Sequence, residues 1–432
     1  MKKKHMIIHA AFWMMLLIVF HITYGKADIV SQINQQEAEY VVRFQSEKAL
    51  ISRDGSEAVP IANGTKLTKS GTYFLTLLDS KQGLKINTFK IPSKKGISFW
   101  AITRESELEE IFKYTLENFE TDITIKFNFG AYDINALNRL FEKNVNNVLE
   151  KYPKLTYEGY TIRVAGEKNP IIDLKFVYPL KVTNTLKNYD IRTDQLLVQI
   201  INETITADMP DYKREVALFK YIIERITYSA TNNQGVSYVN PTPMSHTMYG
   251  GLIDRVAVCD GYAKSLMYLL NAVGVPAQLV VGNTYDGVLH AWNLVKIQGS
   301  YYHADSTWGD ADEDKVGAFY EYLNEKDTYM QKTHRWDTAK YPAAIQLAYN
   351  ILYMPIQVPG TYRIKNKKEL DNVLSNIGKK IPRQATIIFY EDAANKWQEE
   401  ELVNRLVGSV RKPIIYRAER KYNCLVLSFK ID

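Results

Sequence analysis

Cysteine is scarce in this sequence of 432 residues, which has only Cys259 and Cys424. So few cysteines exclude the dense disulfide framework that stabilises many small secreted domains of eukaryotes. Buried apolar surface must therefore hold the fold, and 46% hydrophobic and 12% aromatic residues are enough for sizeable cores. The length excludes one compact domain, because single cores rarely grow past about 250 to 300 residues.

Long hydrophobic runs are absent after residues 1–27. Within this segment, three lysines precede an apolar run over residues 6–20, and the small residues Gly25 and Ala27 follow. This order is typical of a signal peptide, so we predict cleavage before Asp28. The run is shorter than the ~20 residues that span a bilayer, and an uncleaved membrane anchor is the alternative. Either outcome predicts a secreted or cell-surface protein, and the few cysteines favour a bacterial one.

Positive and negative charges are nearly balanced in the rest of the chain. Four of the 54 Lys and Arg lie in the first 27 residues, which leaves 50 against 48 Asp and Glu, a net charge of +2. No nucleic-acid partner is expected from this balance. A membrane would be contacted only through the N-terminal segment, if that segment stays uncleaved.

Residues 28–98 are predicted to form a small β-module. Three alternating runs, separated by turn sequences such as Asn63-Gly64, predict strands of a compact β-sandwich: residues 40–44, 72–78 and 84–89. Residues 63–74 resemble bacterial immunoglobulin-like modules, which implies a role in spacing or adhesion.

An internal repeat is indicated when the sequence is compared with itself at an offset of 262 residues. Six residues match their counterparts without a gap: Ile102, Glu107, Leu108, Thr124, Ile125 and Phe127 match Ile364, Glu369, Leu370, Thr386, Ile387 and Phe389. Each segment predicts two helices and a terminal hairpin in a βαβαββ-like order. Residues 99–200 and 346–432 would then be two copies of one α/β module.

Residues 201–345, between the two copies, are predicted to form the catalytic domain. Apolar residues at helical spacing, such as Phe219 and Ile223, predict a helix over residues 202–228. A proline-containing loop over residues 240–243 follows this helix.

Cys259 begins a second predicted helix, which ends at Gly274 because Pro276 prevents its continuation. A thiol at a helix N-terminus lies beside unpaired backbone N–H groups, which stabilise a thiolate. Asp260 opposes this effect, because a neighbouring carboxylate disfavours a second negative charge. Cys424 lies in a strand-like run and is predicted to be a small buried hydrophobic residue.

A predicted hairpin after this helix brings an imidazole and a carboxylate together. Its two-residue turn pairs Ile297 with Ser300, and this register places Asp305 opposite Trp292. His290 shares a face with Trp292 and is therefore a diagonal neighbour of Asp305. Thiol, imidazole and carboxylate are the groups that nucleophilic cysteine catalysis requires. His303 is two residues before Asp305, so its side chain is expected on the same face of the strand, and it is the alternative base.

Residues 207–341 resemble the transglutaminase-like domain of exported bacterial proteins, a branch of the papain-like cysteine fold. The motifs that carry the resemblance are His246-Thr247-Met248-Tyr249-Gly250, Ala257-Val258-Cys259-Asp260-Gly261-Tyr262-Ala263, His290-Ala291-Trp292-Asn293, Tyr302-His303-Ala304-Asp305-Ser306-Thr307-Trp308 and His334-Arg335-Trp336. The resemblance implies that Cys259 is the nucleophile, His290 the general base and acid, and Asp305 the residue that orients His290.

The resemblance also suggests which residues surround this triad. A substrate pocket is expected from four aromatic side chains: Tyr249, Tyr262, Trp292 and Trp308. Structural or pocket-lining roles are expected for His246 and His334.

No metal or other cofactor is expected. The acidic run that begins at Asp310 imitates a calcium loop, but Lys315 occupies the position that needs glycine. A solvated loop is predicted there instead.

The sequence therefore predicts an α+β multidomain protein with a central transglutaminase-like domain, an N-terminal β-sandwich and flanking βαβαββ-like repeats. The predicted chemistry is acyl transfer from protein or peptide amide bonds, including those of cell-wall peptides. Transfer to water would be hydrolysis, and transfer to a lysine amine would be cross-linking; the sequence leaves both open. A non-catalytic surface protein that uses the fold as a binding scaffold is the alternative.

Overall fold

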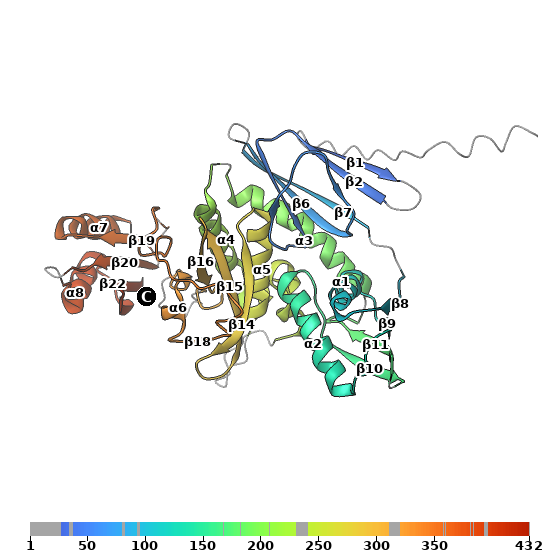
Figure 1. Ribbon diagram of the computed structural model, residues 1–432. Coiled ribbons are helices and arrows are strands. Elements are labelled where there is room, and N and C mark those ends of the chain that lie inside the picture. The colour runs from blue at the N-terminus through green and yellow to red at the C-terminus, as the bar shows by residue number, and fades with distance from the viewer. Residues whose placement is uncertain are drawn as a thin grey trace, which may run out of the picture.

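A computed structural model describes residues 27–431, apart from 34–37, 80–82, 93–95, 167, 182, 207, 230–240, 311–319, 357, 359, 381, 383 and 393–395. The predicted signal segment, except for Ala27, lies outside the described residues. In the described part the strands form six sheets, and the fold combines these sheets with helices (Figure 1). No helix in this part is long and apolar enough to cross a membrane.

The N-terminal β-body consists of two antiparallel sheets with orders β1-β2-β5 and β4-β3-β6-β7. Its strands are β1 (Ala27–Ile33), β2 (Ala38–Phe44), β3 (Lys48–Arg53), β4 (Val59–Pro60), β5 (Thr65–Leu67), β6 (Gly71–Asp79) and β7 (Gly83–Ile91). Val42 of one sheet and Leu75 of the other belong to the same buried cluster, since alternate strand residues point to one face.

The first α/β body follows, with a four-stranded sheet of order β10-β11-β9-β8. Its elements are β8 (Phe99–Ile102), α1 (Leu108–Asn118), β9 (Asp122–Phe127), α2 (Ile134–Lys151), β10 (Gly159–Ala165) and β11 (Ile171–Val177). Strands β8 and β9 are parallel, and the other neighbours are antiparallel. The Asp133 side chain caps α2 by accepting a hydrogen bond from the backbone N–H of Ala136.

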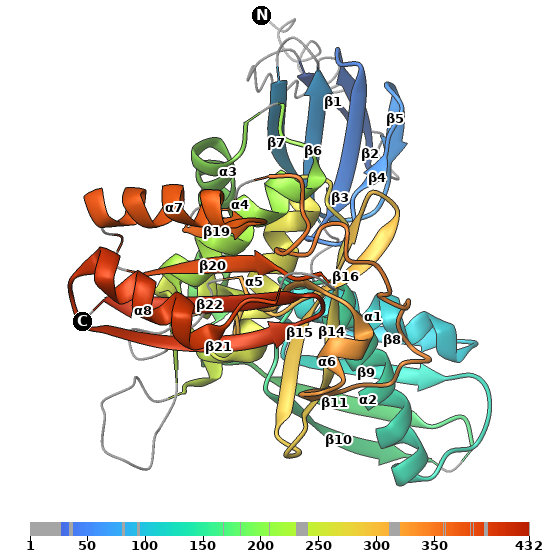
Figure 2. The same ribbon diagram turned by 90° about the vertical axis from the view of Figure 1, so that its left-hand side faces the viewer.

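The C-terminal α/β body has a four-stranded sheet of order β19-β20-β22-β21 (Figure 2). Its elements are β19 (Thr361–Ile364), α7 (Lys367–Lys379), β20 (Gln384–Tyr390), α8 (Glu399–Val410), β21 (Ile414–Lys421) and β22 (Cys424–Ile431). The pair β19 and β20 is parallel, and the remaining neighbours are antiparallel. If the four strands of each α/β body are numbered along the chain, both sheets have the strand order 1-2-4-3.

The central body contains a five-stranded antiparallel sheet of order β17-β16-β15-β14-β18. Its helices are α3 (Thr183–Thr204), α4 (Asp211–Arg225), α5 (Cys259–Ala272) and α6 (Asp327–Met330). Its strands are β12 (Thr227–Tyr228), β13 (Val256–Ala257), β14 (Ala277–Thr284), β15 (Leu289–Ile297), β16 (Ser300–Ala304), β17 (Leu323–Glu325) and β18 (His334–Arg335). Figure 1 shows this body between the two α/β bodies.

The single helix predicted over residues 202–228 is wrong. Helix α3 ends at Thr204, α4 begins at Asp211 after Pro210, and residues 227–228 form β12. Proline lacks a backbone N–H and disfavours helical geometry in the residue before it, so Pro210 separates two helices that the apolar spacing joined. The predicted domain boundary after residue 200 falls inside α3.

Helix α5 and its hairpin agree with the sequence prediction. The helix begins at Cys259, and Gly274 follows its end with a φ of +77°, in the left-handed region that favours glycine. The β15–β16 turn pairs Ile297 with Ser300 through Gln298 and Gly299, both at positive φ. The predicted hairpin register is confirmed.

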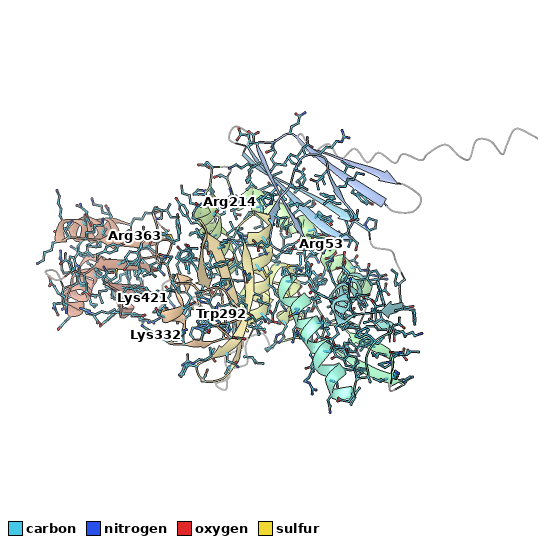
Figure 3. The ribbon with its side chains drawn as sticks, viewed as in Figure 1. Arg53, Arg214, Trp292, Lys332, Arg363 and Lys421 are labelled. Atoms are coloured by element: carbon cyan, nitrogen blue, oxygen red, sulfur yellow. The ribbon has the colours of Figure 1, made fainter. Side chains whose placement is uncertain are left out.

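Buried charges join the first α/β body to the N-terminal body and to α3. The Lys113 ammonium lies 2.9 Å from the Asp54 carboxylate, and the Lys154 ammonium lies 2.8 Å from that of Asp190. Arg53, labelled in Figure 3, donates a hydrogen bond to the Tyr152 hydroxyl. Because a buried ion needs oppositely charged partners, these pairs contribute to how the bodies meet.

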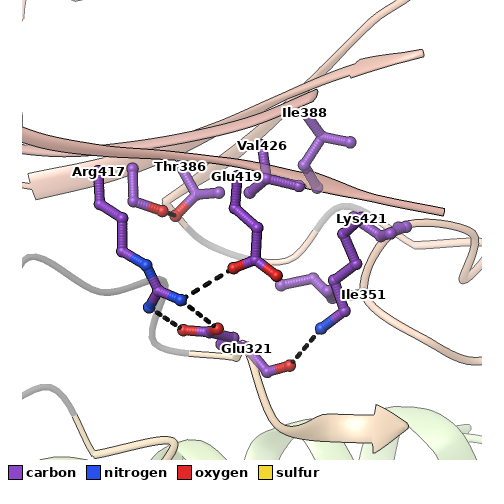
Figure 4. A pocket seen from close by; sticks show the side chains of 10 residues that line it. Glu321, Ile351, Thr386, Ile388, Arg417, Glu419, Lys421 and Val426 are labelled. Carbon is purple, nitrogen blue, oxygen red and sulfur yellow. Dashed lines mark hydrogen bonds and ion pairs between the residues drawn. The ribbon is translucent and has the colours of Figure 1, made fainter. Parts of the chain in front are cut away.

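The C-terminal body contacts the central body through the end of its β21–β22 hairpin. Lys421 Nζ lies 2.5 Å from Glu325 Oε1, and both side chains are at most 4% exposed. Tyr422 donates to the other carboxylate oxygen at 2.9 Å. Beside them, Arg417 donates two hydrogen bonds to Glu321, and Lys421 donates one to the backbone carbonyl of Glu321 (Figure 4).

Replacing Lys421 with Met should reduce the free energy of unfolding by about 3–5 kcal/mol, because Glu325 then stays buried without its charged partner. Urea denaturation of the full chain measures this. Lys340→Met is the matched control: its ion pair with Glu150 is partly exposed, so solvent screens it and a loss below ~1 kcal/mol is expected. Equal losses in both variants would contradict the interface described here.

Candidate active site

Cys259 is the first residue of α5, and its side chain is half-buried. The start of this helix packs closely against the loop that contains Ser245: Val258 N–H donates to the Ser245 carbonyl at 3.0 Å. A Cβ added at Gly261 would lie 2.5 Å from that same carbonyl oxygen. Glycine at residue 261 therefore permits the approach that positions the thiol.

His290, the second residue of β15, contacts both other members of the predicted triad. Its Nε2 lies 2.7 Å from Asp305 Oδ2, and the Cys259 side chain is near enough to the ring to raise the pKa of His290. Since Nε2 is directed at Asp305, Nδ1 is the nitrogen available to the thiol. The structure thus brings together the three residues that sequence reasoning selected.

Asp305 follows β16 and is completely buried. Its Oδ1 accepts hydrogen bonds from the backbone N–H groups of Thr307, at 2.9 Å, and Trp308, at 3.1 Å. Its Oδ2 faces His290 Nε2 and also His334 Nε2, at 3.1 Å. Burial alone would raise the pKa of Asp305, but the charge of His290 and the hydrogen bonds from both histidines hold this pKa well below its usual range.

The same contacts act on His290 in the opposite direction. Burial lowers the pKa of His290, but the negative charge of Asp305 and the hydrogen bonds to Asp305 and Cys259 outweigh burial and raise this pKa to about 10. The imidazole therefore holds its proton at neutral pH, and an imidazolium can pair with a thiolate.

The alternative base, His303, does not face the thiol. Its Nδ1 accepts a hydrogen bond from Trp292 Nε1 at 2.9 Å, and its Nε2 lies 2.8 Å from Asp327 Oδ1. Burial lowers the pKa of His303. With both ring nitrogens occupied, this histidine holds Trp292 in the central sheet, where Figure 3 labels it.

Asp260, beside Cys259, does not carry an uncompensated charge. Its carboxylate lies 3.0 Å from His246 Nδ1 and 3.2 Å from Lys264 Nζ. Burial raises the pKa of Asp260, but Lys264 and His246 lower it below its usual value. Lys264 and His246 together offset the repulsion that the sequence predicted between this carboxylate and a thiolate.

Three of the four residues assigned to a substrate pocket are in the interior. Tyr249, Tyr262 and Trp292 are each at most 1% exposed. Their polar atoms are occupied as well: the two hydroxyls donate to Asp190 and to the Ile226 carbonyl, and the indole donates to His303. This corrects their assignment, because a side chain without exposed surface supports the site and does not line it.

Trp308, the fourth residue of that set, is half-buried and lies against the triad. Its ring centroid is 5.7 Å from that of His290 and 4.5 Å from that of His334. It is therefore placed where it could contact a substrate at His290.

His334, on β18, was expected only in a structural or pocket-lining role. The structure places it against Asp305, on a strand that pairs with β14 on the side opposite β15. Sequence periodicity could not find this contact, because β18 has only two residues. The His334-Arg335-Trp336 motif was the one signal in the sequence.

The prediction of a solvated acidic loop is wrong for Asp310, the first residue of that loop. Asp310 is buried, and its Oδ2 lies 2.5 Å from the Tyr262 hydroxyl oxygen. Residues 311–319 lie outside the described part of the chain.

Among the residues that the structure describes, one group of side chains could hold a metal ion. The ligating atoms of His290, Asp305 and His334 lie within 4.8 Å of one another. These atoms already hydrogen-bond to each other, so an ion there would have to displace the protons that join them.

Residues 198–306 match the family model of the Transglutaminase-like superfamily. The chain contains a transglutaminase-like domain. The matched residues include Cys259, His290 and Asp305, whereas His334 lies beyond them.

Curated relatives match this part of the chain at low identity. The kyphoscoliosis peptidase of Homo sapiens is 23% identical over 184 residues, which are 37% of this chain and 26% of that protein. The Mus musculus kyphoscoliosis peptidase is 22% identical over 181 residues, 36% of this chain and 26% of that protein. The chain spans about a quarter of the length of these relatives.

Solved structures similar to this chain include a TGase and the periplasmic domain of TgpA from Pseudomonas aeruginosa. The TGase has a TM-score of 0.23 and 15% identity, over 60% of this chain and 74% of that one. The TgpA domain has a TM-score of 0.20 and 10% identity, over 66% of this chain and 87% of that one.

The two cysteines should differ sharply in reactivity. Cys259 of the transglutaminase-like domain is accessible and contacts an imidazole, whereas Cys424 is fully buried and burial raises its pKa to about 11. Iodoacetamide at neutral pH should alkylate Cys259 at least ~100-fold faster, as measured by peptide mass spectrometry of the folded protein. Similar rates at both cysteines would contradict a nucleophilic Cys259.

Asp305→Asn should lower the pKa of His290 from about 10 by more than about two units, because the carboxylate that stabilises the imidazolium is gone. An NMR titration of the His290 ring measures this, with His246→Gln as a control that leaves the titration in place. The raised pKa also stabilises the fold: this contribution is complete below about pH 6.5, the ordinary histidine value, and is lost as the pH rises through about 10. A His290 titration unchanged in Asp305→Asn would contradict this account.

Proposed function

We propose that the transglutaminase-like domain is an acyl-transfer enzyme in which Cys259 is the nucleophile, His290 the general acid and base, and Asp305 the residue that orients His290. One observation carries the proposal: a single imidazole binds a fully buried carboxylate, and the thiol at the start of α5 is near enough to raise the pKa of the same ring. A lone helix-start cysteine is usually inert. Thiol, imidazole and carboxylate in one chain of contacts are the parts that cysteine catalysis uses.

In the first half-reaction, the thiolate of Cys259 attacks the carbonyl carbon of an amide. The S–C bond forms while the carbonyl π electrons move to oxygen, and backbone N–H groups at the α5 N-terminus are suited to receive this negative charge. As the intermediate collapses, the C–N bond breaks and His290 Nδ1 gives its proton to the leaving amine. The products are a Cys259 thioester and a free amine.

In the second half-reaction, water or a primary amine attacks the thioester. His290 Nδ1 takes the proton from this nucleophile, the S–C bond breaks, and its electron pair returns to sulfur as thiolate. Water yields a carboxylic acid and makes the enzyme a peptidase or amidase. A lysine amine yields a new amide and makes it a cross-linker, so the acceptor alone separates the two activities.

The substrate class that we propose is a protein or peptide amide bond, including a cell-wall peptide. One relative supports it through its name, a kyphoscoliosis peptidase. We further propose that the chain is exported, because its first 27 residues have the pattern of a signal peptide and its cysteines are few. The N-terminal β-body would then be an immunoglobulin-like sandwich for spacing or adhesion.

We also propose that residues 99–200 and 346–432 are two copies of one module. Their sheets have the same strand order and the same parallel first pair. Burial supports the offset of 262 residues, because matched positions have nearly equal exposure of at most 1%: Ile102 and Ile364, Leu108 and Leu370, Ile125 and Ile387, Phe127 and Phe389.

The test is to capture the thioester. Incubation of the protein with candidate cell-wall peptides or glutamine-containing proteins should add to Cys259 the mass of the substrate's acyl group, as measured by mass spectrometry. His290→Ala should lower the acylation rate by ~10² to 10⁴, because the proton donor for the leaving amine is lost. A fluorescent primary amine in the mixture separates transfer to amines from hydrolysis.

Cys259→Ala is the matched control, which should fold normally and form no adduct. Turnover that survives in Cys259→Ala would show that the chemistry lies elsewhere. A Cys259 that reacts no faster than Cys424 would favour the non-catalytic binding scaffold.

A further inference from the structure

We infer that His334 is a positioning residue of the active site, which holds Asp305 as an oriented carboxylate throughout the acyl-transfer cycle. The inference rests on the proposed function and adds a fourth residue to its triad. His334 lies outside the residues that match the transglutaminase-like family model. It is on β18, whereas Asp305 follows β16 and His290 is on β15.

Asp305 has four hydrogen-bond donors around it. The backbone N–H groups of Thr307 and Trp308 bind Oδ1, and the Nε2 atoms of His290 and His334 lie 2.7 and 3.1 Å from Oδ2. An ionised carboxylate has about four lone-pair sites for hydrogen bonds, so these donors saturate it. A carboxylate without exposed surface stays ionised only through such donors.

The contacts of His334 place its ring proton on Nε2, the nitrogen that faces Asp305. A carboxylate oxygen only accepts, so the nitrogen that faces it, Nε2, must carry the hydrogen. The other nitrogen, Nδ1, lies 2.8 Å from the Thr333 hydroxyl, which can donate to it. The Met330 carbonyl is a second acceptor for this hydroxyl, but at 3.4 Å it is farther away than His334 Nδ1, so the shorter contact favours the Nε2–H form of His334. The contacts then run from Thr333 through His334 and Asp305 to His290.

Aromatic rings enclose the His334 side chain, which has no exposed surface. Ring centroids lie 4.5 Å away for Trp308, 4.9 Å for Trp292 and 5.9 Å for Tyr322. A polar ring in such surroundings costs free energy unless its nitrogens are hydrogen-bonded, and both are. The enclosure also prevents the ring from turning away from Asp305.

The need for a second imidazole arises when His290 has given its proton to the leaving amine. At that point the positive charge beside Asp305 is gone, and the carboxylate could take up a proton and lose its acceptor role. His334 still donates to Oδ2, so Asp305 stays ionised and keeps the Nε2–H of His290 directed at itself. The Nδ1 of His290 is then free to take a proton in the second half-reaction.

Four titratable side chains face Asp305 from the elements around it. His290 is on β15, His303 on β16 and His334 on β18, and Tyr322 immediately precedes β17. Of these, His290 and His334 hydrogen-bond to the carboxylate. A pH effect of replacing His334 is therefore expected to act through Asp305 and His290.

The test measures the alkylation rate of Cys259 by iodoacetamide as a function of pH, which requires no substrate. His334→Phe keeps the ring volume but removes the donor, so Asp305 should take up a proton at higher pH. The acid limb of the profile should move up by about one pH unit. His334→Gln retains an N–H donor in a similar position and should restore most of the wild-type profile.

His303→Phe is the matched control, because His303 is equally buried but binds Asp327 and Trp292. It should lower stability and leave the acid limb in place. A His334→Phe profile identical to the wild type would overturn the inference. Equal shifts in His334→Gln and His334→Phe would also overturn it, since the ring and not the donor would then matter.

If His334→Phe does not fold, two further measurements decide the question. Thr333→Val should move the acid limb in the same direction by a smaller amount. Nitrogen NMR of the wild-type imidazoles should show the hydrogen of His334 on Nε2, and a bare Nε2 would overturn the inference. A wild-type Cys259 that alkylates no faster than Cys424 would instead overturn the proposed function itself, so the two failures are distinguishable.

Discussion

A single fully buried carboxylate, Asp305, is the constraint on which the candidate site depends. Removing an ionised carboxylate from water is costly, and this cost is offset only when hydrogen-bond donors surround the charge. Backbone N–H groups of the turn after β16 supply part of this environment, and imidazoles from two other strands supply the rest. The requirements of one charge therefore decide how three segments meet.

The effect of this charge extends from the carboxylate to the thiol. Asp305, together with Cys259, outweighs burial and raises the pKa of His290 to about 10, and the protonated ring lies beside Cys259 at the start of α5. The α5 N-terminus favours negative charge at the sulfur from its own side. Helix and sheet thus act on the same pair of side chains, and the close packing at Gly261 keeps the helix in place.

Contacts between the bodies support the sheet that carries these residues. Glu325 on β17 pairs with His303 on β16, and it binds Lys421 and Tyr422 of the C-terminal body. That body is therefore part of the scaffold of the site and not only an appendage. Its sheet and that of the first α/β body have the same strand order, so the central body lies between two similar structures.

The sequence by itself determined the local features. The start of α5 at Cys259, its end at Gly274 and the register of the β15–β16 hairpin could be predicted, because helix caps and two-residue turns depend on neighbouring residues. That register was enough to place Asp305 beside His290. Apolar residues at helical spacing continue across Pro210, and for this reason the spacing predicted one helix where the structure has two.

Only the tertiary structure decided which side chains from distant segments surround the triad. Tyr249, Tyr262 and Trp292 proved to be interior residues, since burial depends on what packs over a side chain and not on its motif. His334 reached Asp305 through β18, a strand too short to show any periodicity. The physical reason is that a buried charge selects its partners by distance in space, and pairing between remote strands sets that distance.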